Sequence, residues 1–215
     1  MKVIEVEQNS PEWEAAKSGK FSASNMHKII SPTGKVSKQV DSYIDELIAE
    51  RITGELCNSF KGNAHTERGH EMEDEAANYY AMLYGVEPQK VGFCLTDDEM
   101  IGASPDRLIG DDGMLEIKTC IPRIMVEMYQ DENLEQEHRP QTQCGLFVTG
   151  RKWIDTMLYC PKMKPVIIRS TPIAPFIMDM VRLTKEAHQT LLTRMQGIAE
   201  RGYIDTDPGK YLRAG

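Results

Sequence analysis

The chain has 215 residues, of which 40% are hydrophobic and 27% are charged, and these proportions are typical of a soluble globular protein with a sizeable core. Its formal net charge of −8 argues against a DNA-binding surface spread over the whole molecule, but not against a local one. No apolar run approaches the length of a membrane span, the acidic N-terminus does not resemble a secretion signal, and the five scattered cysteines predict reduced thiols, so we expect a cytoplasmic protein with no membrane partner.

Helix signals dominate the N-terminal part of the sequence. Ser10 followed by Pro11 and acidic residues is typical of a helix start, because serine caps free backbone N–H groups and acids favour the positive end of the helix dipole. Farther on, apolar residues recur at helical spacing, and Gly85 ends the last of these helices. The helices expected here cover residues 10–19, 21–30, 41–53 and 67–84.

Strand signals follow and then alternate with helix signals. Short apolar runs are separated by Asp-rich turns, such as the one at residues 111–113. This order predicts an α/β (α+β) fold in which a central mixed β-sheet is flanked by helices. The expected strands cover residues 91–95, 101–103, 107–109, 114–119, 156–160 and 166–169, and the expected helices cover residues 140–148 and 175–201.

Two short motifs carry the strongest functional signal, Ser-Pro-Asp at residues 104–106 and Glu-Ile-Lys at residues 116–118. On an alternating strand, Glu116 and Lys118 project from one face while the apolar residues beside them face the other way. Asp106 would add a second carboxylate, and two neighbouring carboxylates repel unless a cation lies between them. The motifs therefore predict a Mg²⁺ or Mn²⁺ site, with Lys118 placed to orient or deprotonate a water molecule for phosphodiester hydrolysis.

A purely structural explanation stays open for these residues and for the other candidates. Acids near a turn and Glu-x-Lys on a strand are common. Glu73 lies in the first turn of a helix, where acids favour the helix dipole, although from there it could also complete a metal shell. Gln141 and Gln143 are two residues apart on a helix and do not face the same way, which favours surface positions over phosphate contacts.

Together these segments resemble the phage lambda exonuclease family, also called YqaJ-type viral recombinases, within the restriction-endonuclease-like PD-(D/E)xK nucleases. The likeness covers about residues 10–170 and rests on four motifs in the same order. They are the Trp-to-Ser stretch at residues 13–24, the Gly-x-x-x-Glu-x-x-Ala helix at 69–76, the metal motifs at 104–106 and 115–118, and Gln-Thr-Gln at 141–143 followed by residues 147–150.

The resemblance implies a restriction-endonuclease-like core within one nuclease domain over residues 1–215. Residues 1–66 would be its helical N-terminal part, residues 67–170 its catalytic core, and residues 171–215 a closing helix and a tail that is mobile from Asp205. It further implies Mg²⁺-dependent 5′→3′ degradation of one strand of linear duplex DNA, which leaves 3′ single-stranded overhangs. The expected partners are DNA with a free 5′-phosphorylated end, two further copies in a ring-shaped homotrimer, and a single-strand annealing protein of phage recombination in a bacterial cytoplasm.

The resemblance also implies roles for the residues of the metal site. Two Mg²⁺ ions are expected, for which Mn²⁺ could substitute. Lys118 would orient the attacking water, and Gln141 would lie near the scissile phosphate. The metal ligands would be Asp106, Glu116, the carbonyl oxygen of Ile117, and Glu73.

A second site implied by the resemblance holds the terminal 5′-phosphate of the DNA. Lys17, Ser24 and Ser104 fall at its positions, and Gln143 and His138 are further expected DNA contacts. The prototype of the family has an arginine in place of Lys17. An ammonium lacks the two parallel N–H donors of a guanidinium, so the phosphate would be bound more weakly or in a different geometry. His138 falls where the family often has tyrosine.

Two kinds of alternative remain compatible with the sequence. One is another enzyme of the same fold, an endonuclease or a CRISPR-associated nuclease. Closed circular DNA would distinguish it from an exonuclease, because an exonuclease needs a DNA end and cannot cut the circle. The other is a non-catalytic DNA-binding module, which the net charge of −8 keeps open. The intact set of Asp106, Glu116 and Lys118 argues against the second alternative.

Overall fold

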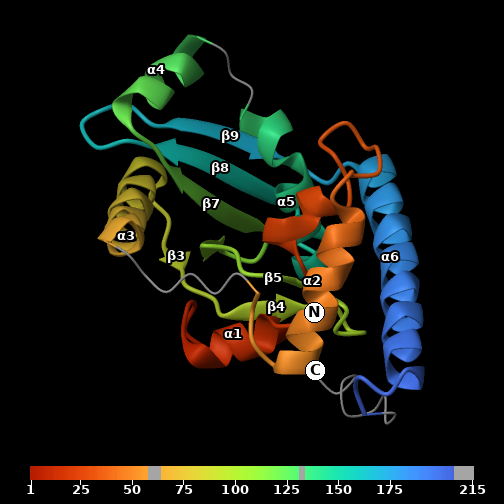
Figure 1. The fold of residues 1–215 in the computed structure, drawn as a ribbon. Coiled ribbons are helices and arrows are strands. Elements are labelled where there is room, and N and C mark those ends of the chain that lie inside the picture. The colour runs from red at the N-terminus through yellow and green to blue at the C-terminus, as the bar shows by residue number, and fades with distance from the viewer. Residues whose placement is uncertain (58–63, 131–133, 206–215) are drawn as a thin grey trace.

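The computed structural model describes residues 1–57, 64–130 and 134–205, and its strands form two mixed β-sheets surrounded by helices (Figure 1). The expected mixed α/β fold is confirmed, although the strands divide between two sheets where the sequence indicated one. The tail beyond residue 205, which we expected to be mobile, lies outside the described residues. Within the described ranges, no helix combines the length and the apolar character that crossing a bilayer requires.

The larger sheet carries the Glu-Ile-Lys motif on its middle strand. β6 and β7 form the antiparallel hairpin expected from the sequence, whereas β7 and β8 run parallel and pair along all of β7. A strand held on both sides is a rigid base for functional side chains. The order is β3-β6-β7-β8-β9, with β3 at Pro88–Gln89, β6 at Arg107–Ile109, β7 at Gly113–Thr119, β8 at Trp153–Tyr159 and β9 at Val166–Ser170.

The smaller sheet leads directly into the Ser-Pro-Asp motif. Its order is β1-β4-β5-β2, with β1 at Lys2–Ile4, β4 at Phe93–Leu95, β5 at Ile101–Ala103 and β2 at Phe21–Ser22. β5 ends at Ala103 and β6 begins at Arg107. Residues 104–106 are therefore the short connection between the two sheets.

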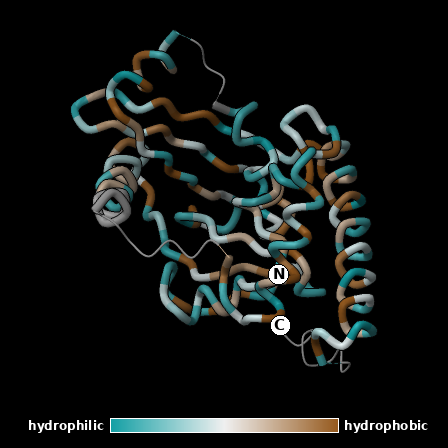
Figure 2. The backbone as a smooth tube through the Cα atoms, viewed as in Figure 1, coloured by the Kyte–Doolittle hydropathy of each residue, from teal (hydrophilic) through white to brown (hydrophobic). Residues whose placement is uncertain are grey.

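Most helices gather around the smaller sheet and form the larger apolar core. Figure 1 shows α6 running beside α2, and Figure 2 shows hydrophobic residues recurring along α6. The buried residues of this core include Phe21, Met26, Tyr43, Leu47, Met180 and Leu191. The helices of this core are the 3₁₀ helix η1 (Ala23–Lys28), α2 (Val40–Thr53), α5 (Leu134–Thr149) and α6 (Ala174–Glu200). Helix α1 (Pro11–Lys17) packs separately, through Trp13, on Phe93 and Leu95 of β4.

Helix α3 (Ala64–Tyr84) packs on one face of the larger sheet. Leu115 and Ile117 of β7 face α3, so Glu116 and Lys118 point to the opposite face of the sheet, as the alternation predicted. The buried residues of this second core are Ala76, Ala77 and Tyr80 from α3 and Ile109, Leu115, Ile117, Met157 and Tyr159 from the sheet.

Hydrogen bonds between side chains fasten α3 to the strands beneath it. The hydroxyl of Tyr80 donates to Oδ2 of Asp155 at 2.5 Å, and the same carboxylate accepts from Nε and Nη2 of Arg169 at 2.8 and 2.9 Å. The hydroxyl of Tyr159 donates to Oε1 of Glu75 at 2.7 Å. These contacts fix the helix that carries Glu73.

Several elements differ from the sequence-based expectation. Residues 21–30 form β2 and the 3₁₀ helix η1 instead of one helix. α5 begins at Leu134, before the expected start, and contains Pro140 in its interior. Strands β1 and β3 and helix α4 (Pro122–Gln130) were not expected. The cap at the start of α1 is as expected, since Oγ of Ser10 accepts from the backbone N–H of Trp13 at 3.2 Å.

Candidate active site

Glu116 and Lys118 on β7 form a hydrogen-bonded group with Gln141 on α5. Nζ of Lys118 donates to Oε1 of Glu116 at 2.7 Å and to Oε1 of Gln141 at 3.2 Å. Nε2 of Gln141 donates to the same oxygen of Glu116 at 2.5 Å. Burial by itself lowers the pKa of Lys118. The charge and hydrogen bond of Glu116, together with the charges of Asp106 and Glu73, outweigh this effect, so the pKa is raised and the side chain stays an ammonium at neutral pH.

Asp106 lies against the backbone of β7. Its Oδ2 accepts a hydrogen bond of 2.6 Å from the N–H of Ile117, the residue between Glu116 and Lys118. Burial and the negative charges of Glu116 and Glu73 together raise the pKa of Asp106 well above its usual range. The hairpin thus places a second carboxylate where the Pro-Asp and Glu-x-Lys pattern predicted it.

Arg107 connects Asp106 with the middle of α3, so the expectation that Glu73 lies in a first helical turn is wrong. Its buried guanidinium donates from Nη1 to Oε1 of Glu73 at 2.7 Å and to the carbonyl oxygen of Asp106 at 2.5 Å, and from Nη2 to Asp74. Glu73 is therefore held at the edge of the site by an ion pair. This role of Arg107 was not expected, because an arginine that follows a turn is usually exposed.

The oxygen-rich character of this group suits a hard divalent cation. Within the described part of the chain, no three His, Cys, Asp or Glu side chains form a metal-binding cluster by themselves, so a cation would also need a backbone oxygen. The carbonyl oxygen of Ile117 leaves the strand on the same side as the N–H that binds Asp106. Two crowded carboxylates, this carbonyl and Glu73 at the edge are oxygen donors of the kind that Mg²⁺ and Mn²⁺ prefer.

A second polar group lies at the N-terminal end of the chain. Nζ of Lys17 lies 4.5 Å from the centre of the Trp13 ring and 3.5 Å from Oγ of Ser24. Nε1 of Trp13 donates to Oγ of Ser104 at 2.8 Å, and the hydroxyls of Ser22 and Ser24 are 3.3 Å apart. Burial lowers the pKa of Lys17, although Glu50 and Glu14 counteract this effect.

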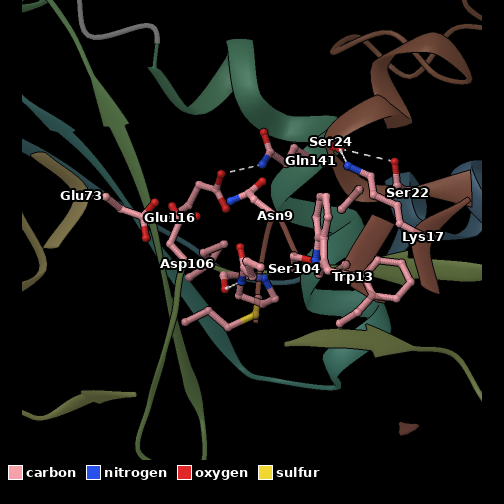
Figure 3. Close-up of a pocket in the computed structure, with 18 of the residues that line it drawn as sticks. Asn9, Trp13, Lys17, Ser22, Ser24, Glu73, Ser104, Asp106, Glu116 and Gln141 are labelled. Atoms are coloured by element: carbon pink, nitrogen blue, oxygen red, sulfur yellow. Dashed lines mark hydrogen bonds between the residues drawn. The ribbon is translucent and has the colours of Figure 1, made fainter. Parts of the chain in front are cut away.

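The two groups share one cavity of about 260 Å³. Figure 3 shows the carboxylates of Glu73, Asp106 and Glu116 on one side of it and Lys17, Ser22, Ser24 and Trp13 on the other. Acidic oxygen donors and a cation with hydroxyls therefore face the same space. Trp13 is buried and packs edge-on against Phe93, so it anchors α1 on β4.

Comparison with known proteins assigns the chain to a family. Residues 12–152 match the YqaJ-like viral recombinase domain, which is more than half of the sequence. The chain belongs to the YqaJ-like viral recombinase family. No match was found among curated proteins.

Solved structures with the same fold as this YqaJ-like chain include exonucleases. An alkaline exonuclease (LHK-Exo) from Laribacter hongkongensis superposes with a TM-score of 0.79 at 26% sequence identity, over 90% of this chain and 98% of that one, and so does its complex with dAMP. A phage-related exonuclease from Haemophilus somnus 129PT superposes with a TM-score of 0.65 at 17% identity, over 85% and 96% of the two chains, which shows a shared fold.

Two expected DNA contacts of this YqaJ-like chain do not line the cavity. Gln143 is buried, and its amide donates to the carbonyl oxygen of Thr171 at 3.0 Å and accepts from the N–H of Ile173 at 2.7 Å, so it fastens the segment before α6. His138 is partly buried on α5, where burial and the charge of Lys118 lower its pKa and favour the neutral imidazole. His138 is nevertheless close enough to Lys118 and Glu116 for both charges to act on its pKa, whereas Gln143 is held by the backbone before α6.

The cavity of this YqaJ-like domain also contains residues that the motif analysis did not single out. Gln8 lines it and donates from Nε2 to the carbonyl oxygens of Val91 and Pro105, both at 2.9 Å. Asn9, the next residue, has a φ of 66° and projects into the cavity (Figure 3). The only sequence signal for either residue is their position directly before the helix cap Ser10.

Proposed function

We propose that this chain is a Mg²⁺-dependent exonuclease that degrades one strand of linear duplex DNA from its 5′ end and leaves 3′ single-stranded overhangs. A nuclease activity follows from its membership of the YqaJ-like family, and the metal, the polarity and the product are the proposal. The observation that carries it is the single cavity in which the Asp106, Glu116 and Lys118 group faces the Lys17, Ser24 and Ser104 group.

In this proposal the side chains around β7 perform the hydrolysis. Asp106, Glu116 and the carbonyl oxygen of Ile117 would hold the metal, with Glu73 at the edge. When bound, Mg²⁺ or Mn²⁺, in a pair of ions, supplies a water of lowered pKa and stabilises the leaving oxygen. The ammonium of Lys118 orients the attacking water, and Gln141, which already contacts Glu116 and Lys118, holds the scissile phosphate beside them.

Lys17, Ser24 and Ser104 would determine the direction in which the strand is degraded. A positively charged side chain flanked by hydroxyls is a suitable site for a terminal 5′-phosphate, whereas a 3′-hydroxyl end offers it no charge. Binding of dAMP by the structural relative from Laribacter hongkongensis supports a 5′-mononucleotide as the released product. We also propose, from the resemblance, a ring-shaped homotrimer that acts with a single-strand annealing protein in phage-type recombination inside a bacterial host.

Digestion of linear duplex DNA labelled at one end tests the metal and the polarity together. We expect mononucleotides to be released from 5′-phosphorylated ends in Mg²⁺, no release after chelation with EDTA, and restored release when Mn²⁺ is added. Closed circular duplex should stay intact. Release from the 3′ end, cutting of the circle, or full activity in EDTA would each contradict the proposal, and cutting of the circle would favour an endonuclease.

Replacing Lys17 with alanine should slow digestion of 5′-phosphorylated ends more than that of 5′-hydroxyl ends. Loss of one charge-assisted hydrogen bond costs about 1.5–3 kcal/mol, which is about a ten- to hundredfold change in the specificity constant. Initial rates on matched ends, compared as kcat/KM, check this. Lys17→Arg should retain most of the preference, and Lys152→Ala, which removes an exposed lysine outside the cavity, should leave it unchanged. Equal slowing on both ends would remove the phosphate site from the proposal.

A further inference from the structure

The turn that carries Asn9 is anchored on both sides of this residue. Gln8 is fixed by its two hydrogen bonds to the carbonyl oxygens of Val91 and Pro105, and Pro105 directly precedes Asp106. Ser10 caps α1, the helix that carries Trp13 and Lys17. Asn9 therefore occupies a fixed place between the segment of Asp106 and the helix of Lys17.

Among the described residues, no side-chain hydrogen bond explains the position of Asn9. It is exposed, and within the described part of the chain no hydrogen bond engages its amide. It lines the active-site cavity and also a neighbouring hollow of about 710 Å³, and both of these contain Asp106 and Glu73. In Figure 3 its amide lies between the carboxylates and the Lys17 group.

In the proposed reaction, the first nucleoside of the DNA strand would occupy the space at Asn9. A strand whose 5′-phosphate lies at Lys17 and whose next phosphate lies at Asp106 and Glu116 must hold its first nucleoside between them, where Asn9 is found. A carboxamide offers both a donor and an acceptor, which suits the mixed polar edge of a nucleoside. We propose that Asn9 binds the nucleoside part of the 5′-terminal nucleotide. This inference rests on the proposed function and adds a residue that recognises the end to be released.

The backbone at Asn9 allows a clean test. A positive φ is accepted by asparagine and, with no side chain, by glycine. Asn9→Gly therefore removes the amide without disturbing the turn. Lys162, with a φ of 67°, lies in an exposed turn outside the cavity, so Lys162→Gly is a matched control for the backbone effect.

Calorimetric titration of the Mg²⁺-loaded protein with dAMP and with inorganic phosphate separates the two parts of the ligand. We expect Asn9→Gly to weaken dAMP binding about tenfold, the loss of one hydrogen bond to a polar ligand, and to leave phosphate binding unchanged. Lys17→Ala should weaken both ligands, and Lys162→Gly neither. The same Asn9→Gly variant should raise the KM for DNA ends at an unchanged melting temperature.

Unaltered dAMP binding and KM in Asn9→Gly would overturn the role of Asn9 while leaving the proposed exonuclease intact. An equal loss of dAMP and phosphate binding would also overturn it, because the amide would then act on the phosphate. If the unaltered protein bound neither ligand and released no nucleotides from 5′ ends, the proposed function itself would fail, and the inference with it.

Discussion

Replacing Lys118 with alanine is expected to remove nearly all strand cleavage while DNA binding is retained. Nζ of Lys118 contacts Glu116 and Gln141, two of the residues proposed to surround the metal and the scissile phosphate. A positioned group that orients or deprotonates a nucleophile contributes about 10²–10⁴-fold to a rate. We therefore expect kcat to fall by about a thousandfold, with little change in affinity for DNA, since the residues proposed to bind phosphate stay in place.

Single-turnover digestion in Mg²⁺ measures the fall in the cleavage rate of Lys118→Ala. Gel-shift titration in Ca²⁺ measures its affinity for DNA. Melting curves in Mg²⁺ show whether Lys118→Ala is folded, because bound metal compensates the carboxylates that lose their ammonium partner. Lys152→Ala is a suitable control, since Lys152 is exposed, pairs with Asp112 at 2.9 Å and does not line the active-site cavity. Full activity of Lys118→Ala would refute the role in water orientation.

The largest loss of stability is expected from Asp155→Ala. Asp155 is 2% exposed and accepts three hydrogen bonds, one from Tyr80 and two from Arg169. Its carboxylate raises the pKa of Arg169, and burial together with this carboxylate raises the pKa of Tyr80, so both partners depend on it. Removing it leaves the Tyr80 hydroxyl buried without an acceptor, and we expect a loss of about 3 kcal/mol in the free energy of unfolding.

Thermal and urea unfolding would measure this loss, which corresponds to a melting temperature lower by roughly 6–12 °C for a protein of this size. Tyr80→Phe removes only the hydroxyl and should cost about 1 kcal/mol. Arg169→Ala should also cost about 1 kcal/mol, because the side chain of Arg169 is half exposed and solvent screens its charge. If Asp155→Ala unfolded like the unaltered protein, the attachment of α3 would have to depend on its apolar contacts alone.

Local sequence signals predicted the elements that depend on local physics. The cap at Ser10, the alternation in β7 and the tight turn before Gly113 each involve neighbouring residues, and all three are present in the structure. The second sheet could not be predicted in this way, because β2 has two residues and pairs with β5, a strand far away in the sequence. Pro140 suggested a helix start, yet a helix can accommodate proline in its interior at the loss of one hydrogen bond.

In the site, too, contacts between residues close in sequence could be predicted, and contacts between distant residues could not. The closeness of Asp106, Glu116 and Lys118 could be expected because a hairpin and an alternating strand place them. Arg107 could not be recognised, because its burial depends on α3 folding back onto the sheet. Gln143 shows the reverse case, since a residue with suitable chemistry turns away to bind the backbone before α6.

The connection between the two sheets has a consequence for the length of DNA removed in each cycle. Ser104 lies beside the proposed phosphate anchor and Asp106 beside the proposed cutting group, and only Pro105, whose φ is fixed by its ring, separates them. Their Cα atoms can be no more than about 7 Å apart. This fixed spacing would set the distance between the bound 5′-phosphate and the phosphate that is cleaved. Each cycle would therefore remove the same length of strand, whatever its sequence.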